Sequence, residues 1–344
     1  MASADAFASE LRAAQERLSA LLAAFSRVRV LVVGDLTLDE FVTGQVDRLS
    51  REAPVLILNH ERTEQIPGGG ANATYNLAQL GGQVAAVGLV GADSQGQALR
   101  QLLAAAGVDT SGILEARDRP TVTKTRIAGH ARQSVTQQIV RLDRTAHHWP
   151  QPEVEAQIVA GIQHQRDAVD AVVCSDYGEG VLSDSAIMAA LAHERTVVDA
   201  QSRLARYAGA TLFTPNLPEA ERAAGHAIAD AGDLERAGQA LLQLTQAQGL
   251  LITRGESGMS AFERSGAAWH LPALNRADVF DVTGAGDTVV AALTLALSAG
   301  ASLWEAAVLG NLAASVVVRK FGTATATVAE MQAALAHYLD GDGR

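Results

Sequence analysis

The sequence predicts an α/β fold around a parallel sheet, because short apolar runs alternate with stretches that have helical spacing. The first run, Val28 to Val33, is largely β-branched and ends at Gly34-Asp35, which is typical of a strand buried on both faces. Similar runs predict strands at 84–90, 171–174, 196–198 and 249–252. Helices are expected between them at 72–80, 95–106, 219–224 and 234–247.

Helices are also expected near both ends of the chain. Apolar residues in the first 27 positions are spaced by three or four, which predicts an amphipathic helix that packs on the body or on a partner. These residues are Phe7, Leu11, Ala14, Leu18, Leu21 and Phe25. The segment lacks the basic start and unbroken apolar centre of a signal peptide. Ala-rich stretches at 288–297 and 303–318 predict two further helices.

Two stretches, 41–66 and 121–142, depart from this alternation of apolar strands and amphipathic helices. Polar and apolar residues alternate in both, without a helical period. Such alternation is typical of antiparallel strands that face solvent on one side. We therefore expect one small sheet, inserted twice into the α/β body, with strands from about 40–67 and 120–143.

Composition excludes several classes of protein. The 344 residues carry a formal net charge of −11, and 48% of them are hydrophobic. The acidic balance argues against a nucleic-acid binder, and the single cysteine against a disulfide framework. No apolar run approaches the ~18 residues of a membrane span. We therefore expect a cytoplasmic protein with neither a nucleic-acid nor a membrane partner. The two lysines, Lys124 and Lys320, follow Thr123 and Arg319, so the chain has no Walker A motif.

The segment Asp281-Val-Thr-Gly-Ala-Gly-Asp287 carries the most chemical information. A small-residue turn that opens a helix exposes main-chain N–H groups at the positive end of the helix dipole, which suits a phosphate or developing negative charge. Asp287 stands where a carboxylate can accept a proton from an attacking hydroxyl. Taken alone, the segment is equally well explained as a glycine turn with a capping aspartate.

Three further segments place polar groups at the ends of expected strands or the starts of helices. In Pro67-Gly-Gly-Gly-Ala-Asn72, the glycines would let a substrate approach the backbone and the asparagine could bind sugar hydroxyls. Asp35 and Asp39 follow the first strand, where α/β sheets bind ligands. Asn216 and Glu219 could organise metal-bound waters around phosphates. Helix caps and first turns are the structural alternatives at all three places.

Hydrolase motifs are absent from the sequence. Gly255-Glu-Ser-Gly-Met259 departs from Gly-x-Ser-x-Gly at its last position, and neither His-Glu pair has the second histidine of a zinc protease.

In this order, the segments resemble the ribokinase-like (PfkB) carbohydrate kinase family. The resemblance rests on Gly68-Gly-Gly-Ala-Asn72 running into Asn76-Leu-Ala-Gln-Leu-Gly81, on Asp281–Asp287, on Thr214–Glu219 and on Thr253–Gly258. It implies a three-layer sandwich with a central, mostly parallel sheet and a small β-sheet lid. It covers a kinase domain at 28–335, which leaves an N-terminal helix at 1–27 and a tail at 336–344.

Within the family, the chain is most similar to the D-glycero-β-D-manno-heptose-7-phosphate kinases. Segments that resemble this subgroup include Arg48–Val55, Thr123-Lys-Thr-Arg126, Val140-Arg-Leu-Asp143 and Ser175-Asp-Tyr-Gly178. The resemblance implies transfer of the γ-phosphate of ATP to O1 of the heptose 7-phosphate, with Mg²⁺ as the metal. It is to the stand-alone kinase, with no fused nucleotidyltransferase expected after Arg344. The lid is expected to form a homodimer.

The resemblance also implies a role for individual residues. Asp287 is the expected base, and the N–H groups of Gly284, Ala285 and Gly286 are expected to neutralise developing charge. The nucleotide and its metal are assigned to Asn216, Glu219, Thr253, Gly255, Gly258, Asn311 and Ala314, with Asn216 and Glu219 on the Mg²⁺ side. The sugar is assigned to Asp35, Asp39, Gly69, Gly70 and Asn72, and an anionic group on it to Lys124, Arg126 and Arg141.

The chain departs from the subgroup at two positions, since Glu179 and Gln201 stand where lysines are usual. Losing two cations should weaken binding of an anionic sugar. Either Arg203 and Arg206 compensate, or the substrate is a less anionic sugar or a nucleoside-like alcohol. From a different class, a sugar- or nucleotide-sensing protein on the kinase fold is the remaining alternative, and the intact 281–287 segment argues against it.

Overall fold

A computed structural model describes residues 4–131, 135–146, 149–275, 281–320 and 322–340. Within these residues, nine strands form a central sheet in the order β13-β12-β11-β10-β9-β8-β1-β4-β5. Their bounds are β1 Arg29–Gly34, β4 Gln83–Gly91, β5 Asp109–Ala116, β8 Ala171–Asp176, β9 Thr196–Ala200, β10 Leu212–Phe213, β11 Gly249–Thr253, β12 Met259–Glu263 and β13 Ala268–Leu271. All pairings from β5 to β11 are parallel, which confirms the predicted α/β fold with a mostly parallel sheet.

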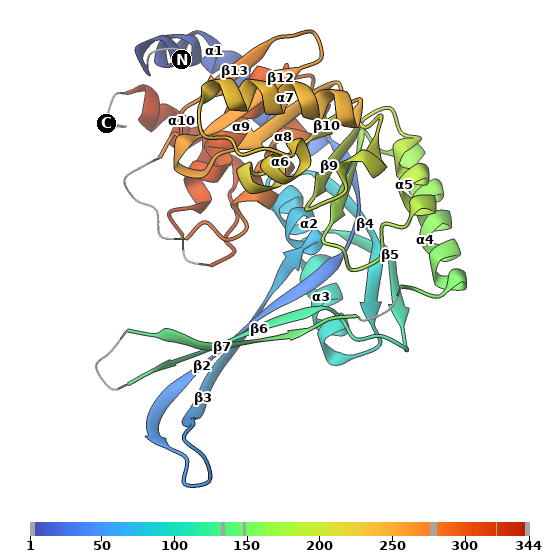
Figure 1. The fold of residues 1–344 in the computed structure, drawn as a ribbon, viewed down its shortest axis with the longest axis vertical. Helices are drawn as coiled ribbons and strands as arrows, with labels where there is room; N and C mark the ends of the chain where they lie inside the picture. The colour runs from blue at the N-terminus through green and yellow to red at the C-terminus, as the bar shows by residue number, and fades with distance from the viewer. Residues whose placement is uncertain (1–3, 132–134, 147–148, 276–280, 321, 341–344) are drawn as a thin grey trace.

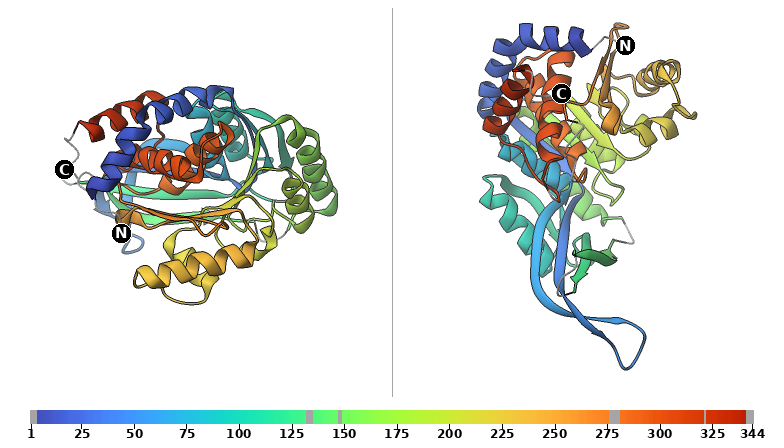
Figure 2. Two further views of the ribbon diagram at one scale, coloured as in Figure 1. Left: turned by 90° about the horizontal axis from the view of Figure 1, so that it is seen from above. Right: turned by 90° about the vertical axis from the view of Figure 1, so that its left-hand side faces the viewer.

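Helices cover both faces of this sheet, as Figures 1 and 2 show. Their bounds are α1 Ala4–Ala24, α2 Gly70–Gln79, α3 Ser94–Ala105, α4 Pro152–Gln165, α5 Asp184–Leu191, α6 Leu217–Ala224, α7 Ala231–Thr245, α8 Ala285–Ser298, α9 Leu303–Val317 and α10 Val328–Leu339. Strand β1 shows why three layers form. Val30 and Val32 enter one hydrophobic core, which α8 and α9 share, whereas Leu31 and Val33 enter a second core on the other face.

A small second sheet projects from this body in the order β3-β2-β6-β7 (Figure 1). Its strands are β2 Leu36–Leu49, β3 Leu56–Gly69, β6 Thr123–His130 and β7 Gln137–Arg144. The predicted insertion is therefore present, but one pairing differs from the prediction. The β2–β3 and β6–β7 pairs are antiparallel, whereas β2 and β6 pair in parallel. Because the chain returns to the body between β3 and β6, the second insertion enters in the same direction as the first.

Several elements of the body were not predicted, among them the strands β5 and β10 and the helices α4, α5 and α10. The sheet ends in an antiparallel hairpin, β12–β13, beyond β11. In addition, α10 ends at Leu339, so residues 336–339 belong to the last helix instead of the expected tail.

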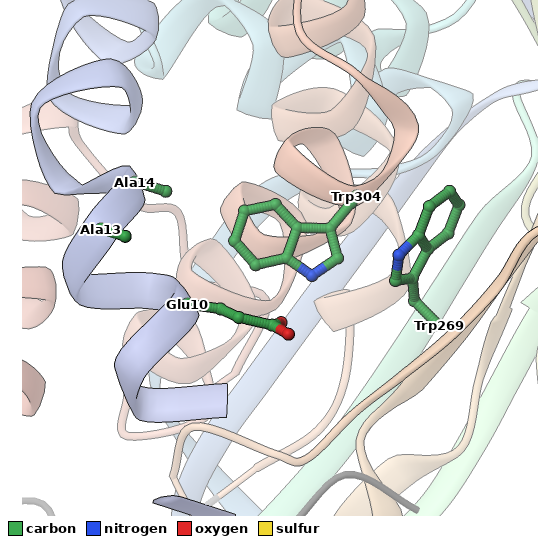
Figure 3. A pocket seen from close by; sticks show the side chains of 5 residues that line it. All are labelled: Glu10, Ala13, Ala14, Trp269 and Trp304. Carbon is green, nitrogen blue, oxygen red and sulfur yellow. The ribbon is translucent and has the colours of Figure 1, made fainter. Parts of the chain in front are cut away.

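The N-terminal helix packs on the body through the predicted seam. Phe7, Leu11, Leu18, Leu21 and Phe25 are all buried, and Phe7 makes an edge contact with a tyrosine of α10. A cavity of about 430 Å³ lies between α1 and the main sheet, and Figure 3 shows its lining. The lining residues are Glu10, Ala13, Ala14, Trp269 and Trp304. Among the described helices, none has the length and apolar character that crossing a bilayer requires.

Candidate active site

The two glycine-rich turns predicted from the sequence lie side by side, because the helices that they open, α2 and α8, pack against each other. Two buried hydrogen bonds join these helices. Asn72 Nδ2 donates to Oδ2 of Asp287 over 2.6 Å, and the Thr288 hydroxyl donates to Oδ1 of Asn76 over 2.8 Å. Asn76 in turn donates to Oδ1 of Asn72 over 3.0 Å. The side chain of Asn72, predicted to bind sugar hydroxyls, is thus engaged with the predicted base.

Asp287 is the centre of the site. It lies in the first turn of α8, is 6% exposed, and accepts a second hydrogen bond on Oδ1 from the Tyr177 hydroxyl over 3.0 Å. Burial raises the pKa of Asp287, the two hydrogen bonds and the positive charge of Lys124 oppose the rise, and the negative charge of Asp39 adds to it, so that the pKa lies at about 6. A carboxyl with this pKa is ionised at neutral pH and can still accept a proton from a hydroxyl.

The turn before Asp287 requires glycine at position 284. Gly284 caps α8 with φ +76°, and a Cβ there would lie 2.7 Å from Asn72 Nδ2 and 2.8 Å from Thr323 Cγ2. The N–H groups at the start of a helix have no acceptor within it and point out along its axis. That of Ala285 donates to the main-chain oxygen of Val282 over 3.2 Å, within the turn. The N–H of Ala285, which was expected to neutralise developing charge, is therefore used within the turn itself.

The predicted lid residues share one face of the small sheet. Asp39 pairs in register with Lys124, and Arg126 pairs with Arg141, so these side chains emerge on the same side. The Lys124 ammonium lies 5.6 Å from the centre of the Tyr177 ring, and its charge acts on Asp287. This face of the small sheet is therefore turned toward the predicted base.

The cations on this face differ in their surroundings. Arg126 Nη1 lies 3.1 Å from Oδ1 of Asp39, and its guanidinium stacks on Phe41 at 5.1 Å. Arg141, on the outer strand, is half exposed and pairs with Asp143 of its own strand. Arg126 is thus held in place by its neighbours, while Arg141 extends along the edge of the sheet.

Gly68, Gly69 and Gly70 let the chain pass close to β2. A Cβ at Gly69 or Gly70 would lie 3.1 Å from the main-chain oxygen of Asp35, and one at Gly68 would lie 3.1 Å from the Asp39 carboxyl carbon. Gly69 also has φ +52°. The glycines therefore bring the first turn of α2 against the two aspartates that follow β1.

A cavity of about 780 Å³ opens on the other side of α8, next to the predicted base. It contains six of the seven residues assigned to the nucleotide: Asn216, Thr253, Gly255, Gly258, Asn311 and Ala314. Ala285 and Gly286 of the glycine turn also line it. The volume falls within the ~300–1,000 Å³ of small-molecule sites. The side chain of Asn311 holds the segment after β13, since its amide donates to the Pro272 oxygen over 2.7 Å.

Asn216 and Glu219 form a reciprocal cap at the start of α6. Each side chain accepts a hydrogen bond from the other residue's main-chain N–H, in both cases over 2.9 Å. This is the structural alternative considered for the pair, and it leaves Oε1 of Glu219 outside the cap. Burial raises the pKa of Glu219.

A third carboxylate, Asp199 at the end of β9, lies close enough to interact with both Glu219 and Asp287. Burial raises its pKa, and the charges of the other two raise it further. Within the described residues, no group of three or more His, Cys, Asp or Glu side chains is arranged to hold a metal by itself. Carboxylates that disfavour one another's charge nevertheless suit a divalent cation shared with phosphates.

Three residues at or beside the site were not assigned from the sequence: Tyr177, Asp199 and Arg119. The only sequence signal of Tyr177 is the resemblance of the segment Ser175–Gly178 to the subgroup, and no local pattern marks Arg119. The proposed substitutes for the missing lysines lie elsewhere. Arg203 and Arg206 line a separate cavity of about 450 Å³, where Arg206 binds Asp184 over 2.8 Å.

The fold and the site together define a class of protein. A three-layer α/β body, a nucleotide-sized cavity and a buried carboxylate at a helix N-terminus are the parts of a phosphotransferase that acts on an alcohol. The chain belongs to the pfkB family of carbohydrate kinases, whose family model matches residues 29–330. Kinases of this family use ATP and typically a divalent metal.

Curated relatives are named bifunctional protein HldE. That of Gluconacetobacter diazotrophicus is 43% identical over 317 residues and that of Geobacter metallireducens is 42% identical over 323 residues. These alignments cover 90% and 92% of this chain but 64% and 65% of the relatives, so the chain spans less than two thirds of their length.

Two solved structures share the fold. Phosphofructokinase-2 from Escherichia coli in complex with fructose-6-phosphate superposes with a TM-score of 0.71 at 20% identity, covering 90% of this chain and 99% of that one. Ribokinase from Arabidopsis thaliana, complexed with ribose and ATP, gives 0.67 at 19% identity, with 91% and 98% covered. At these identities the likeness shows the fold alone.

Proposed function

We propose that this protein transfers the γ-phosphate of ATP to O1 of D-glycero-D-manno-heptose 7-phosphate and so forms the 1,7-bisphosphate. One observation carries the proposal: Asp287 lies between the 780 Å³ cavity and the cationic face of the small sheet. A nucleotide in the cavity and a sugar under the small sheet would both reach this carboxylate. The family and the resemblance to the heptose-phosphate kinases support the choice of substrate.

In this mechanism the chain binds and orients the two substrates and neutralises the charge that develops during transfer. Asp287 accepts the proton of the attacking hydroxyl while its position is held by Asn72 and Tyr177. The N-terminus of α8 offers N–H groups and its dipole to the charge that develops on the transferred phosphoryl group. Mg²⁺ would be held through water on the side of Asn216 and Glu219, where it would neutralise phosphate charge.

The order of cations along β6 supports a substrate with its anionic group far from the reacting hydroxyl. Lys124 acts on Asp287, whereas Arg126 lies two residues further along the strand, about 7 Å away on the same face. Arg141 lies beside Arg126 on the neighbouring strand. A sugar that reacts at one end and carries a phosphate at the other would match this spacing.

A less anionic sugar is the second candidate, because Glu179 and Gln201 replace two expected lysines. The deciding experiment is an ATP-consumption assay with Mg²⁺, which compares heptose 7-phosphate with free heptose and with common neutral sugars. We expect strong preference for the 7-phosphate, and loss of turnover by about 10²–10⁴-fold in Asp287→Asn. Preference for a neutral sugar would overturn the substrate, and turnover that no sugar stimulates would overturn the kinase itself.

We further propose a homodimer formed through the small sheet. The face opposite the cationic one carries exposed apolar residues, with Val140 49% and Leu142 50% exposed. Strand β7 is exposed along its whole length, and exposed apolar edges are typical of protein interfaces. Sedimentation should show a dimer that Val140→Glu converts to a monomer. A monomeric wild-type protein would refute this assembly.

A further inference from the structure

The segment after β8, residues 177–181, forms a loop that no sequence motif assigned to the reaction. Its first residue, Tyr177, reaches Asp287 with its hydroxyl over 3.0 Å. The two residues are 110 positions apart, so this contact exists only because the fold brings β8 beside the start of α8. Burial and the neighbouring carboxylates raise the pKa of Tyr177 well above its usual value, so the phenol stays protonated and is the donor.

Asp35 fixes the main chain of this loop. Its carboxylate, 1% exposed, accepts three N–H groups: those of Tyr177 over 2.9 Å, Glu179 over 3.0 Å and Val181 over 3.1 Å. Both carboxylate oxygens are therefore engaged by the loop. In this structure Asp35, which was expected to bind the sugar, is the anchor on which the loop is built.

A buried cation fixes the same loop from another side. Arg119 is 7% exposed and donates from Nη2 to the main-chain oxygen of Glu179 over 2.8 Å. Its charge interacts with the carboxylates of Asp35 and Glu179. N–H groups and a carbonyl of one short loop are thus bound by opposite charges, which restricts the directions available to the Tyr177 side chain.

We propose that Tyr177 is a positioning residue for phosphoryl transfer, held by the loop that Asp35 and Arg119 fix, and that it sets the orientation of the Asp287 carboxylate. With Asn72 on Oδ2 and Tyr177 on Oδ1, both oxygens of the base are held by donors. Each oxygen keeps a second lone pair, and one of these accepts the substrate proton. The inference rests on the proposed kinase function.

The titration of Asp287 reports this contact directly. The groups that act on the carboxyl are Asn72 from α2, Tyr177 from the loop, Asp39 from β2 and Lys124 from β6, and Asp199 from β9 interacts with it. A donor to the ionised form lowers a carboxyl pKa. Removing the Tyr177 hydroxyl while the other groups stay in place must therefore raise the pKa of Asp287 above about 6.

The experiment is a pH titration of the full chain with ¹³C-labelled aspartate, followed by NMR, with the Asp287 carboxyl assigned through Asp287→Asn. In Tyr177→Phe we expect the midpoint to rise by about one pH unit. Tyr207→Phe is the matched control, because that buried tyrosine donates to Asp176 over 2.6 Å instead of to Asp287. Its midpoint should equal that of the wild type.

Kinetics on the same variants test the role in the reaction. We expect the acid limb of kcat/KM for the sugar, which reports the free enzyme, to follow the NMR midpoint, so that kcat/KM of Tyr177→Phe at pH 6 falls by about fivefold from ionisation alone. The KM for ATP should not change. An NMR midpoint that stays at the wild-type value, or a wild-type pH profile of kcat/KM, overturns the inference.

The NMR measurement needs no sugar, so its result is separate from a failure of the proposed function, which would show as a wild-type protein without sugar-stimulated turnover. If Tyr177→Phe does not fold, Asp35→Asn takes its place. That variant removes the carboxylate that anchors the loop and should raise the same midpoint, and an unchanged midpoint would overturn the inference.

Discussion

The turn that opens α8 contains two glycines that should respond in opposite ways to the same substitution. Gly284 has φ +76°, which costs an alanine about 1–2 kcal/mol, and its added Cβ would lie 2.7 Å from Asn72 Nδ2. Gly286 lies within the helix, and a Cβ there would meet nothing within 4 Å. Alanine is favoured over glycine by about 0.5–1 kcal/mol at such a position.

We therefore expect Gly284→Ala to lower the free energy of unfolding by about 1–3 kcal/mol and Gly286→Ala to leave it unchanged or raise it. Urea unfolding followed by circular dichroism, without ligand, measures both. Gly284→Ala should also lower kcat at least about tenfold, because displacing Asn72 releases Asp287. Equal stability of the two variants would refute the conformational reason given for this turn.

Three further outcomes are expected. Because burial raises the pKa of Asp287 from 3.8 to about 6, ionisation of this carboxyl lowers the stability of the wild type as the pH rises through this window. Between pH 4 and pH 8, Asp287→Asn should therefore gain up to about 3 kcal/mol of unfolding free energy relative to the wild type. A pH-independent difference in urea unfolding would contradict this. Arg126→Met should raise the KM for heptose 7-phosphate at least about tenfold and Arg141→Met should raise it less, since Arg126 is held in place and Arg141 is half exposed. Equal effects on KM in steady-state kinetics would count against the proposal that Arg126 binds the anionic group more strongly than Arg141 does. Leu18→Ala on the buried seam of α1 should cost about 2–5 kcal/mol of unfolding free energy, and a loss below 1 kcal/mol would mean that α1 contributes little to the fold.

The parallel core of the sheet could be predicted because its strands are buried on both faces. Such strands, of which β1 is an example, leave an uninterrupted apolar signal in the sequence. The β12–β13 hairpin could not be found in this way. A buried polar residue, Ser260, interrupts the apolar pattern of β12, and its hydroxyl pairs with His270 of β13 over 2.8 Å. A polar residue that finds its partner only across a strand pair gives no local signal.

The small sheet illustrates a different limit. Alternation in the sequence shows that strands form, and the hairpins β2–β3 and β6–β7 follow from proximity along the chain. The parallel pairing of β2 with β6 depends instead on how the chain passes through the body between them. Because the register of that pairing places Lys124 beside Asp39, the cationic face of the site also depends on it.

The site likewise combines features that have a local signal in the sequence with features that have none. Turns that open helices could be predicted, because glycine and a following carboxylate give them a local signature. The partners of Asp287 could not, since Asn72 and Tyr177 reach it from 215 and 110 positions away. Asp35 follows β1 as the sequence indicates, but its three hydrogen bonds to the loop come from residues more than 140 positions downstream.

The loop also explains how the chain can carry Glu179, where the subgroup that it resembles usually has lysine, without a change in the geometry of Asp287. Asp35 and Arg119 bind the N–H and carbonyl groups of Glu179, which every residue type offers, and not its side chain. The direction of Tyr177 therefore depends on the backbone of the loop, and position 179 is free to change charge. Arg119 interacts with the added carboxylate as well, so part of the charge that the substitution introduces is compensated within the loop. Position 179 can thus change its charge while the carboxylate of Asp287 stays where it is.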